Sequence, residues 1–368
     1  MDKVANTQGD GPRVAIGMMS GTSMDGIDIA AISTDGDSIL ARSGGAMMPY
    51  PPQVRSALAA ALETARSLGT KTDALDGLGA QITRLHADVV KDFLSKHSAL
   101  QPDVIGFHGQ TVLHRPERRL TWQIGDGSLL AELTGIPVGW DVRAKDVASG
   151  GQGAPLASAY HAAIVDDEQP VAILNLGGVA NITWVSPNGD LMAMDCGPAN
   201  ALGDMWGATH DAGKFDEGGR IAARGSVRED ILTNMADNPF FDAPPPKSLD
   251  RLDFDLGPVR GLNLSDGAAT LTAFTAEAVW IAQTHFPEPV GRWLVTGGGR
   301  HNQVLMEMIQ SRVSAPVEPI EAAGYDGDLL EAAAYAFLAV RSMQGKPLTF
   351  PSTTGAPEPL PGGILSEP

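Results

Sequence analysis

The sequence predicts an α/β protein built as two lobes, and three observations support this fold class. The chain has 368 residues, which is long for a single hydrophobic core. Strand patterns alternate with helix patterns along it. Two glycine-rich hairpins, at 13–34 and 171–186, lie in different halves of the chain and suggest an internal duplication. A coincidence of two unrelated hairpins is the alternative.

The first hairpin carries the strongest local signal. Its strands are marked by alternating apolar residues, Val14 and Ile16 on the way in and Ile27 and Ile29 on the way out. Asp25-Gly26 is a tight-turn pair. The turn also holds Ser20, Gly21, Thr22 and Ser23, whose small size and hydroxyl groups would let main-chain N–H groups surround an anion. We therefore predict a phosphate loop here, with an ordinary hairpin as the alternative.

The remaining elements follow in order. Apolar periodicity predicts helices over 54–65, 73–93, 129–133, 155–164, 268–285 and 329–343, and two more that begin at Asn200 and Asn302. Apolar runs predict strands over 104–107, 120–124, 136–140, 191–194 and 293–296. The segment 240–254, with three consecutive prolines, reads as an exposed connection or a cover segment.

These elements suggest a division of the chain. We expect an N-terminal lobe of 12–165, completed by a helix at about 326–343, and a C-terminal lobe of 166–325. The ends, 1–11 and 344–368, are expected to be loose tails because they are rich in small residues, proline and glycine.

The composition excludes several classes of protein. The chain has 26 Lys and Arg against 44 Asp and Glu, a net charge of -18, which disfavours binding to nucleic acid or to anionic membranes. No apolar run approaches the length of a membrane span, and the N-terminus lacks the apolar core of a signal peptide. The single cysteine, Cys196, excludes an intramolecular disulfide and a zinc site with several thiolates. We expect a soluble, cytoplasmic protein that acts on a small molecule.

The glycine pattern indicates a nucleotide site of a particular kind. The chain has no Walker lysine loop, no G-x-G-x-x-G between strand and helix, no H-E-x-x-H and no G-x-S-x-G. Two hairpins could each touch part of a polyphosphate, and Gly297-Gly298-Gly299 after a strand would let a planar base lie against the backbone. In this order the three features indicate the nucleotide cleft of the actin, hexokinase and Hsp70 type.

Asp195 is the candidate general base. It follows the strand 191–194 and precedes Cys196-Gly197-Pro198, which force a sharp exit. A carboxylate at a strand end can accept a proton at neutral pH, although an Asx turn or a helix cap is the alternative. Cys196 is better explained as a small packing residue than as a nucleophile, because no histidine is near it in sequence.

Four polar residues are candidates for binding a sugar. His108 and Gln110 follow the strand 104–107, at the edge where open α/β sheets place their ligands, but a core histidine bonded to backbone is the alternative for His108. Arg143 lies in a mixed-charge turn that reads either as solvated surface or as part of a cleft. Glu331 begins an apolar helix, where an acid favoured by the helix dipole is the alternative.

Several separate motifs occur in one order along the chain. They are SGTSMDGID, HGQT, QIGD, DVRAKDVASGGQGAPL, NLGGVANIT, DCGPAN and VTGGGRHN. In this order they resemble the anhydro-N-acetylmuramic acid kinase family, and the resemblance runs from about Ile16 to Val340. It implies a two-lobed actin-like or hexokinase-like (ribonuclease H-like) fold, with the nucleotide cleft between the lobes.

The resemblance also implies a reaction. The family uses ATP and water to convert 1,6-anhydro-N-acetylmuramic acid to N-acetylmuramic acid 6-phosphate and ADP, in the recycling of the bacterial cell wall. Asp195 matches the catalytic base, which would take a proton from a water attacking the anomeric carbon while the freed O6 attacks the γ-phosphate. ATP and Mg²⁺ are the implied cofactors, and the family tends to form homodimers.

The binding residues carry over position by position. The first ATP-binding loop matches Gly21, Thr22, Ser23, Met24, Asp25, Gly26, Ile27 and Asp28. The second hairpin matches Gly177, Gly178 and Asn181, and the adenosine side matches Gly297, Gly298, Gly299 and Asn302. The sugar side matches His108, Gln110, Arg143 and Glu331.

Three departures from the family pattern are visible. Ala199 stands where glycine is usual, Tyr335 stands where phenylalanine is usual, and KSLDRLDF at 247–254 differs from the usual K-S-T-G-R-E-x-F. The last difference leaves the role of that loop open. Two rival functions remain at this point, a kinase for another amino sugar and a nucleotide-dependent binding protein of the actin or Hsp70 kind.

Overall fold

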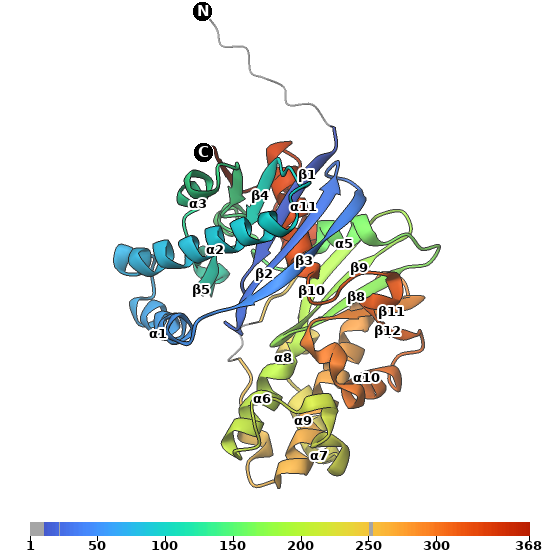
Figure 1. Ribbon diagram of the computed structural model, residues 1–368. Helices are drawn as coiled ribbons and strands as arrows, with labels where there is room; N and C mark the ends of the chain where they lie inside the picture. Colours follow the sequence, from blue (N-terminus) through green and yellow to red (C-terminus); the bar gives the residue numbers. More distant parts are fainter. Residues whose placement is uncertain (1–10, 22, 250–252) are drawn as a thin grey trace, which may run out of the picture. The chain divides into compact units, whose positions relative to one another are not determined.

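The computed structural model describes residues 11–21, 23–249 and 253–368. The chain divides into two compact units (Figure 1). Unit 1 comprises Met1–Ile164, Glu331–Phe350 and Ala356–Pro368, and unit 2 comprises Val165–Leu330 and Pro351–Gly355. Each unit contains a mixed β-sheet and helices, so the predicted α/β class is confirmed.

The main sheet of unit 1 has the strand order β15-β7-β4-β1-β2-β3. Its strands are β1 (Arg13–Met19), β2 (Gly26–Thr34), β3 (Ile39–Pro49), β4 (Val104–Phe107), β7 (Val138–Trp140) and β15 (Ile364–Ser366). Two further pairs are β5 (Gln110–Arg115) with β6 (Leu120–Ile124), and β13 (Pro347–Thr349) with β14 (Leu360–Pro361). The helices are α1 (Pro52–Leu68), α2 (Asp76–Lys96), α3 (Gly127–Thr134), α4 (Ala144–Ala148), α5 (Ser158–Ile164) and α11 (Leu330–Met343).

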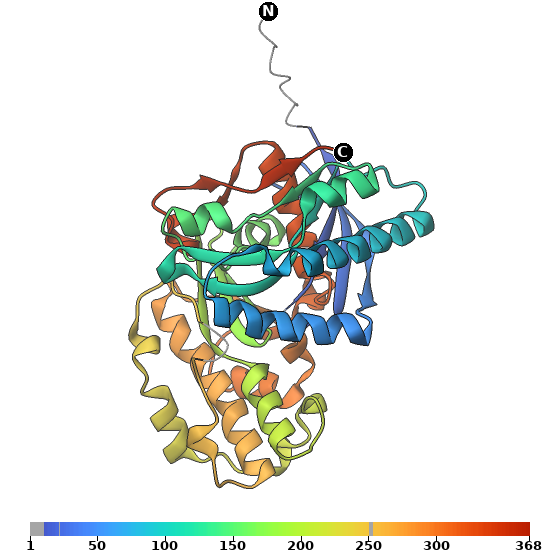
Figure 2. The same cartoon turned by 90° about the vertical axis from the view of Figure 1, so that its left-hand side faces the viewer.

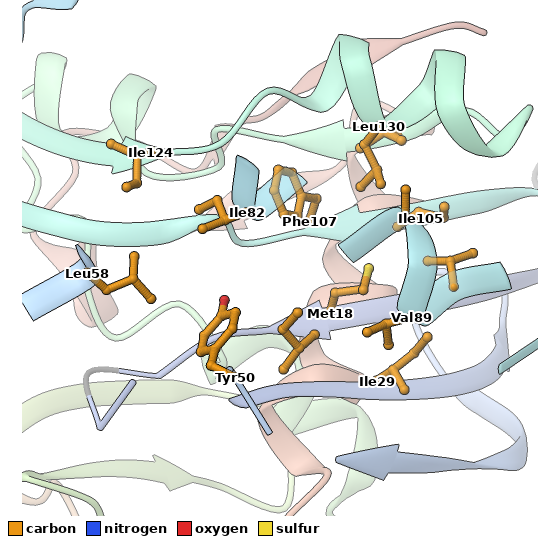
Figure 3. Close-up of a cluster of buried hydrophobic side chains, with 14 of the residues drawn as sticks. Met18, Ile29, Tyr50, Leu58, Ile82, Val89, Ile105, Phe107, Ile124 and Leu130 are labelled. Carbon is orange, nitrogen blue, oxygen red and sulfur yellow. The ribbon is translucent and has the colours of Figure 1, made fainter. Parts of the chain in front are cut away.

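Apolar side chains on one face of this sheet form the core of unit 1 (Figure 3). Met18 of β1 and Phe107 of β4 lie on this face and pack with Leu58 of α1 and Ile82 of α2. All four side chains are buried, as the helical spacing of the apolar residues in α1 and α2 predicts. The first hairpin is therefore held against a rigid layer.

A row of glycines on the opposite face lets helix α11 approach the sheet. Gly17, Gly106 and Gly139 are paired in register across β1, β4 and β7. A Cβ at Gly17 would lie 1.8 Å from the carbonyl oxygen of Ala332, and one at Gly106 would lie 2.0 Å from that of Tyr335. The backbone of α11 thus rests directly on the sheet, and this contact fixes where the N-terminal end of the helix points.

The sheet of unit 2 has the strand order β10-β9-β8-β11-β12. Its strands are β8 (Val171–Leu176), β9 (Val179–Val185), β10 (Leu191–Pro198), β11 (Arg292–Thr296) and β12 (Val317–Pro319). The helices are α6 (Asn200–Thr209), α7 (Glu229–Ala236), α8 (Pro239–Asp242), α9 (Leu264–Ala282), α10 (Gln303–Gln310) and α12 (Pro351–Thr354). One core cluster lies between the sheet and helices α9 and α10, and a second joins α6, α7 and α9, which Figure 2 shows gathered together.

The two sheets repeat one topology. In unit 1, β1 pairs antiparallel with β2, which pairs antiparallel with β3, and β1 and β4 are parallel. In unit 2, β8 pairs antiparallel with β9, β9 pairs antiparallel with β10, and β8 and β11 are parallel, which are the same three relationships in the same order. The shared topology supports the internal duplication that the two hairpins suggest.

Several predicted elements need correction. The segment 344–368 is not a loose tail, because it contains α12, β13 and β14, and β15 completes the main sheet by pairing with β7. The segment 240–254 is not simply exposed, since Phe241 and Lys247 are buried. Strand β10 does not end at 194 but continues to Pro198, so Asp195 lies inside it. Thr22 and most of the predicted N-terminal tail lie outside the described residues.

The sequence also predicts no strand at β12, β3 or β5. β3, with the sequence ILARSGGAMMP, mixes apolar residues, glycines and Arg42, so it shows no clean alternation. β5 begins at Gln110, which the sequence places in a polar edge rather than in a strand. Backbone pairing with β2 and with β6 decides both, and pairing of this kind is a tertiary effect.

Candidate active site

The first hairpin turn spans 20–25 and joins β1 to β2. Ser23 and Asp25 are exposed, and the Ser23 hydroxyl donates a hydrogen bond to Asp25 at 2.7 Å. Met24 has a φ of 53° and its N–H donates to the carbonyl of Gly21, so the backbone reverses tightly. Gly26 and Ile27 are buried, which leaves the backbone of this part as the surface that could contact a ligand.

Side chains from neighbouring elements hold this turn in place. The Ser20 hydroxyl donates to Gln110 Oε1 at 2.6 Å and lies 2.8 Å from the hydroxyl of Tyr50. Gln110 Nε2 donates to the carbonyl of Gly21 at 3.2 Å. Gln110 is only 1% exposed, and both ends of its amide are used by the turn. The structure therefore places Gln110 as a support of the predicted phosphate loop.

His108 also supports the turn, in a single tautomer. Its Nδ1 lies 3.2 Å from the carbonyl oxygen of Ser20, which can only accept, so Nδ1 carries the hydrogen. Its Nε2 therefore accepts, from Thr111 Oγ1 at 3.3 Å or from Arg143 Nη2 at 3.4 Å. Burial and the nearby Arg143 charge lower the pKa of His108 to about 3. His108 thus matches its predicted alternative, a buried neutral histidine bonded to backbone.

Arg143 is the centre of a polar cluster in unit 1. Its Nη1 donates to the carbonyl of Gly153 at 2.9 Å, and its Nη2 lies 3.4 Å from the hydroxyl of Tyr335. Its buried Nε has no hydrogen-bond partner among the described residues. The guanidinium is therefore built into the protein by these contacts and is not simply part of a solvated surface.

Glu331 and Tyr335 lie one helical turn apart at the start of α11. The Glu331 side chain is exposed, and the charge of Arg143 acts on its carboxyl. Burial raises the pKa of the Tyr335 hydroxyl. The His108 and Tyr335 rings lie 4.9 Å apart. Three of the four predicted sugar-side residues, His108, Arg143 and Glu331, therefore belong to one neighbourhood.

The glycine loop at 149–154 is ordered by buried polar groups. Asp146 is 2% exposed, and its Oδ2 accepts a hydrogen bond of 2.6 Å from the N–H of Gly153. His114 Nε2 lies 2.9 Å from the carbonyl oxygen of Gln152. A Cβ at Gly151 would lie 2.3 Å from Asp146 Oδ2, so glycine is needed there. Asp146 thus fixes this loop beside Arg143.

The second hairpin turn and the triple glycine come together in unit 2. A Cβ at Gly297 would lie 2.4 Å from Asn175 Oδ1 and 2.7 Å from the carbonyl oxygen of Leu176, and Gly297 has a φ of 75°. The N–H of Asn200, at the start of α6, donates to the carbonyl of Gly177 at 3.0 Å. The structure therefore brings Gly177, Gly178 and Gly297–Gly299 to one end of this sheet, as the predicted nucleotide contacts require.

Arg300 holds the triple-glycine turn. It is 8% exposed, and its Nη1 donates to the carbonyl of Gly297 at 3.0 Å and to Asp328 at 2.9 Å. Its Nε donates to Glu321 at 2.9 Å. Asn302, one turn further along, caps α10 by accepting a hydrogen bond from the N–H of Leu305. The cap that the sequence predicts is confirmed.

Asp195 stands in a row of polar residues across the sheet of unit 2. Strand pairing places Asp195 opposite Asn181, Asn181 opposite Asn175, and Asn175 opposite Thr296. Directly paired residues point to the same face of a sheet. Met194 and Cys196, on either side of Asp195, pack into the core on the other face. The carboxylate therefore points away from that core, on the same face as the two asparagines.

The carboxylate of Asp195 is recessed and held. The residue is 8% exposed, and its Oδ2 accepts a hydrogen bond of 2.8 Å from the N–H of Leu249. Its own N–H donates to the carbonyl of Lys247 at 2.9 Å. The strand has a bulge between Asp195 and Gly197. Cys196 is 1% exposed, and burial raises the pKa of its thiol, which suits a packing residue and not a nucleophile.

Sequence reasoning missed four residues of this arrangement. Tyr50, Arg300 and Lys247 each hydrogen-bond a residue of the predicted site. Asn175, Arg300 and Lys247 stand within the quoted stretches NLGGVANIT, VTGGGRHN and KSLDRLDF, but no individual role was predicted for them. The register of the second hairpin was an available signal for Asn175, because it pairs Asn175 with Asn181 once the turn is placed at Gly177-Gly178.

Among the described residues, no helix is long and apolar enough to span a membrane.

The chain matches one protein family over almost its whole length. The family described as anhydro-N-acetylmuramic acid kinase matches residues 13–366. A relative of that name from Paramagnetospirillum magneticum is 51% identical, over 95% of this chain and 98% of its own. One from Rhizorhabdus wittichii is 50% identical, over 96% of this chain and 99% of its own.

Solved structures give a more distant likeness. A ROK hexokinase from Thermus thermophilus aligns with a TM-score of 0.39 and 14% identity, over 89% of this chain and 99% of its own. Similarity at this level does not bear on function. The match to the family and to relatives of that length and identity is decisive, and the chain belongs to the anhydro-N-acetylmuramic acid kinase family.

Proposed function

We propose that this protein phosphorylates 1,6-anhydro-N-acetylmuramic acid with ATP while water opens the anhydro ring, giving N-acetylmuramic acid 6-phosphate and ADP. Membership of the family carries this proposal. The product would serve the recycling of peptidoglycan. The proposal also includes a cytoplasmic location, where ATP is supplied, and a homodimer, as the family resemblance implies.

Asp195 is proposed as the single base of the reaction. Water attacks the anomeric carbon, the bond from this carbon to O6 breaks, and O6 attacks the γ-phosphorus as the bond to the β-phosphate oxygen breaks. The proton of the attacking water goes to Asp195, and ADP leaves. The position of Asp195 on the sheet face away from the core supports this role, as does the hydrogen bond from Leu249 that orients its carboxylate.

Main-chain groups are proposed to bind the nucleotide. The turn at 20–25 and the turn at Gly177-Gly178 would each offer main-chain N–H groups to phosphate oxygens. Such groups matter here because the chain is acidic, with a net charge of -18, and has few basic side chains to offer. Gly297–Gly299 are the proposed adenosine side, and a Cβ at Gly298 would meet only Asn200 Nδ2, at 3.9 Å, so there is space beside this glycine. Arg143 and Glu331 are the proposed sugar contacts, with His108 and Gln110 supporting the loop.

Mg²⁺ is the proposed metal cofactor, bound together with ATP. Among the described residues, no group of three or more His, Cys, Asp or Glu side chains is arranged to hold a metal ion. We propose an ion held mostly by phosphate oxygens and water, as Mg²⁺ commonly is. Asp25, exposed in the first turn, and Asp28, half-buried on β2, are the candidate carboxylates. Bound Mg²⁺ would neutralise charge on the transferred phosphoryl group.

Replacement of the base tests the proposal. We expect Asp195→Asn to fold and to bind ATP as the native chain does, but to lose at least about a hundredfold in turnover, because general base catalysis contributes that much. Near-native turnover by this variant would remove Asp195 from the mechanism.

Isotope labelling tests the coupled reaction. With anhydro-sugar, ATP and oxygen-18 water, mass spectrometry should find one label at the anomeric hydroxyl and phosphate at O6. A product phosphorylated without label, or equal activity on an amino sugar that lacks the 1,6-bridge, would indicate a kinase for another sugar.

A further inference from the structure

The loop that begins at Lys247 has a defined contact with the proposed base. This loop departs from the family pattern, so its sequence left its role open. In the structure, the Lys247 carbonyl accepts the N–H of Asp195 at 2.9 Å, and the N–H of Leu249 donates to Asp195 Oδ2 at 2.8 Å. Two residues of one short segment thus hold both the backbone and the carboxylate of Asp195.

The Lys247 side chain runs back into the protein and anchors this segment. Lys247 is 8% exposed, and its Nζ donates to the carbonyl of Phe240 at 2.8 Å and to that of Phe241 at 3.1 Å. The ammonium also lies 4.6 Å from the centre of the Phe240 ring. A buried ammonium is costly unless its hydrogens are used, so these contacts fix its position firmly.

The far end of the anchor is itself rigid. Phe241 is 3% exposed, and its ring packs against Phe254 and Phe274, with centroids 5.8 Å away in each case. The carbonyl of Phe241 is also 3.0 Å from Nε2 of His285. Lys247 therefore links Asp195 to an aromatic cluster through one chain of described contacts.

We propose that Lys247 is a positioning residue for Asp195, which it serves by anchoring the segment whose Leu249 N–H orients the carboxylate. The inference rests on the proposed role of Asp195 as the base. A hydrogen bond from Leu249 favours the charged carboxylate and fixes its orientation. Loss of the anchor lets the segment move, so proton transfer slows while nucleotide binding is unchanged.

The test compares Lys247→Met with His285→Gln. Methionine keeps an unbranched stem but removes the ammonium, whereas the His285 variant removes a different contact to the same Phe241 carbonyl and leaves Lys247 intact. We expect kcat of Lys247→Met to fall by about tenfold, a part of the hundredfold or more that a general base supplies. KM for ATP should stay within about twofold, since no nucleotide contact is changed.

Two further measurements separate positioning from general damage. The acid limb of the pH profile of kcat should move to higher pH in Lys247→Met, because the loosened segment no longer holds the Leu249 N–H against the carboxylate. Hydrogen exchange in the peptide that contains Leu249 should become faster in Lys247→Met and remain native in His285→Gln. Native kcat and native exchange in Lys247→Met would overturn the inference, and so would an equal loss of kcat in His285→Gln.

A second variant covers the case in which Lys247→Met does not fold. Leu249→Pro removes the N–H that Asp195 accepts and leaves the ammonium in place, and it should lower kcat and shift the acid limb in the same direction. A native pH profile in Leu249→Pro would overturn the inference. Asp195→Asn distinguishes failure of the proposed base from failure of the role of Lys247. If Asp195→Asn is active, Asp195 is not the base. If it is inactive, the variants at Lys247 and Leu249 test the positioning role by themselves.

Discussion

The glycine row under α11 gives the sharpest prediction. In Gly106→Ala, the new Cβ would lie 2.0 Å from the carbonyl oxygen of Tyr335, whereas ordinary contact begins at 3.4 Å. Helix α11 must therefore retreat by about 1.4 Å, because its backbone cannot turn aside as a side chain could. Overpacking of this kind costs about 3 kcal/mol in free energy of unfolding.

Thermal and urea unfolding measure this effect. A loss of about 3 kcal/mol corresponds to a fall of roughly 6–12 °C in Tm for a unit of this size. The same retreat would shift Glu331 and Tyr335 relative to Arg143, so we expect activity to fall by at least about tenfold even where the protein folds. KM for the sugar should rise, because these residues are the proposed sugar contacts.

Gly77→Ala is the matched control. Gly77 lies exposed in α2, and a Cβ there would have no atom within 4 Å. Alanine in a helix should leave the stability unchanged or raise it by up to about 1 kcal/mol. If Gly106→Ala were as stable as Gly77→Ala, the backbone of α11 could not lie against β4, and the explanation for the position of Glu331 would be wrong.

Two more predictions concern the nucleotide turn and the response to pH. Arg300→Gln removes the hydrogen bond to the Gly297 carbonyl and should raise KM for ATP by about tenfold. Arg292→Gln removes a more exposed ion pair with Glu318 and should leave KM for ATP unchanged. Equal effects of the two substitutions in steady-state kinetics would contradict a role of Arg300 in holding the nucleotide turn. Burial lowers the pKa of His86 from 6.5 to about 4, so the unfolded chain binds a proton that the folded chain does not, and stability should decrease as the pH falls from 6.5 towards 4. Urea unfolding at several pH values should show a smaller decrease in His86→Phe, and an identical pH dependence in both proteins would exclude His86 as a contributor.

Local sequence was sufficient for much of this protein. The first hairpin forms between β1 and β2 because apolar residues alternate on both of its strands. The second forms around Gly177-Gly178 for the same reason. The turn of the first hairpin spans 20–25 and is longer than the predicted Asp25-Gly26 pair, because Gly26 is already the first residue of β2. Helix α10 begins where Asn302 caps it, and α1 ends at Gly69, which adopts a left-handed conformation with a φ of 62°. These features depend on neighbours in the chain, and the sequence displays such neighbours directly.

Contacts between distant residues decided the rest. His108 and Gln110 look like ligand-binding residues in the sequence. In the structure their side chains instead hydrogen-bond Ser20 and Gly21, almost 90 residues away, and hold the first hairpin turn in place. Asp195 looks like the end of a strand, yet β10 continues past it through the bulge.

Short-range periodicity predicts the two hairpins and the fold class, and ordered motifs point to Asp195 as the candidate base. The contacts around these features appear only in the folded chain. They are the row of Asp195 with Asn181 and Asn175, the row of glycines against which α11 packs, and the hydrogen bonds that anchor Lys247. Strand register and side-chain burial bring these groups together from distant parts of the chain, and neither leaves a local pattern.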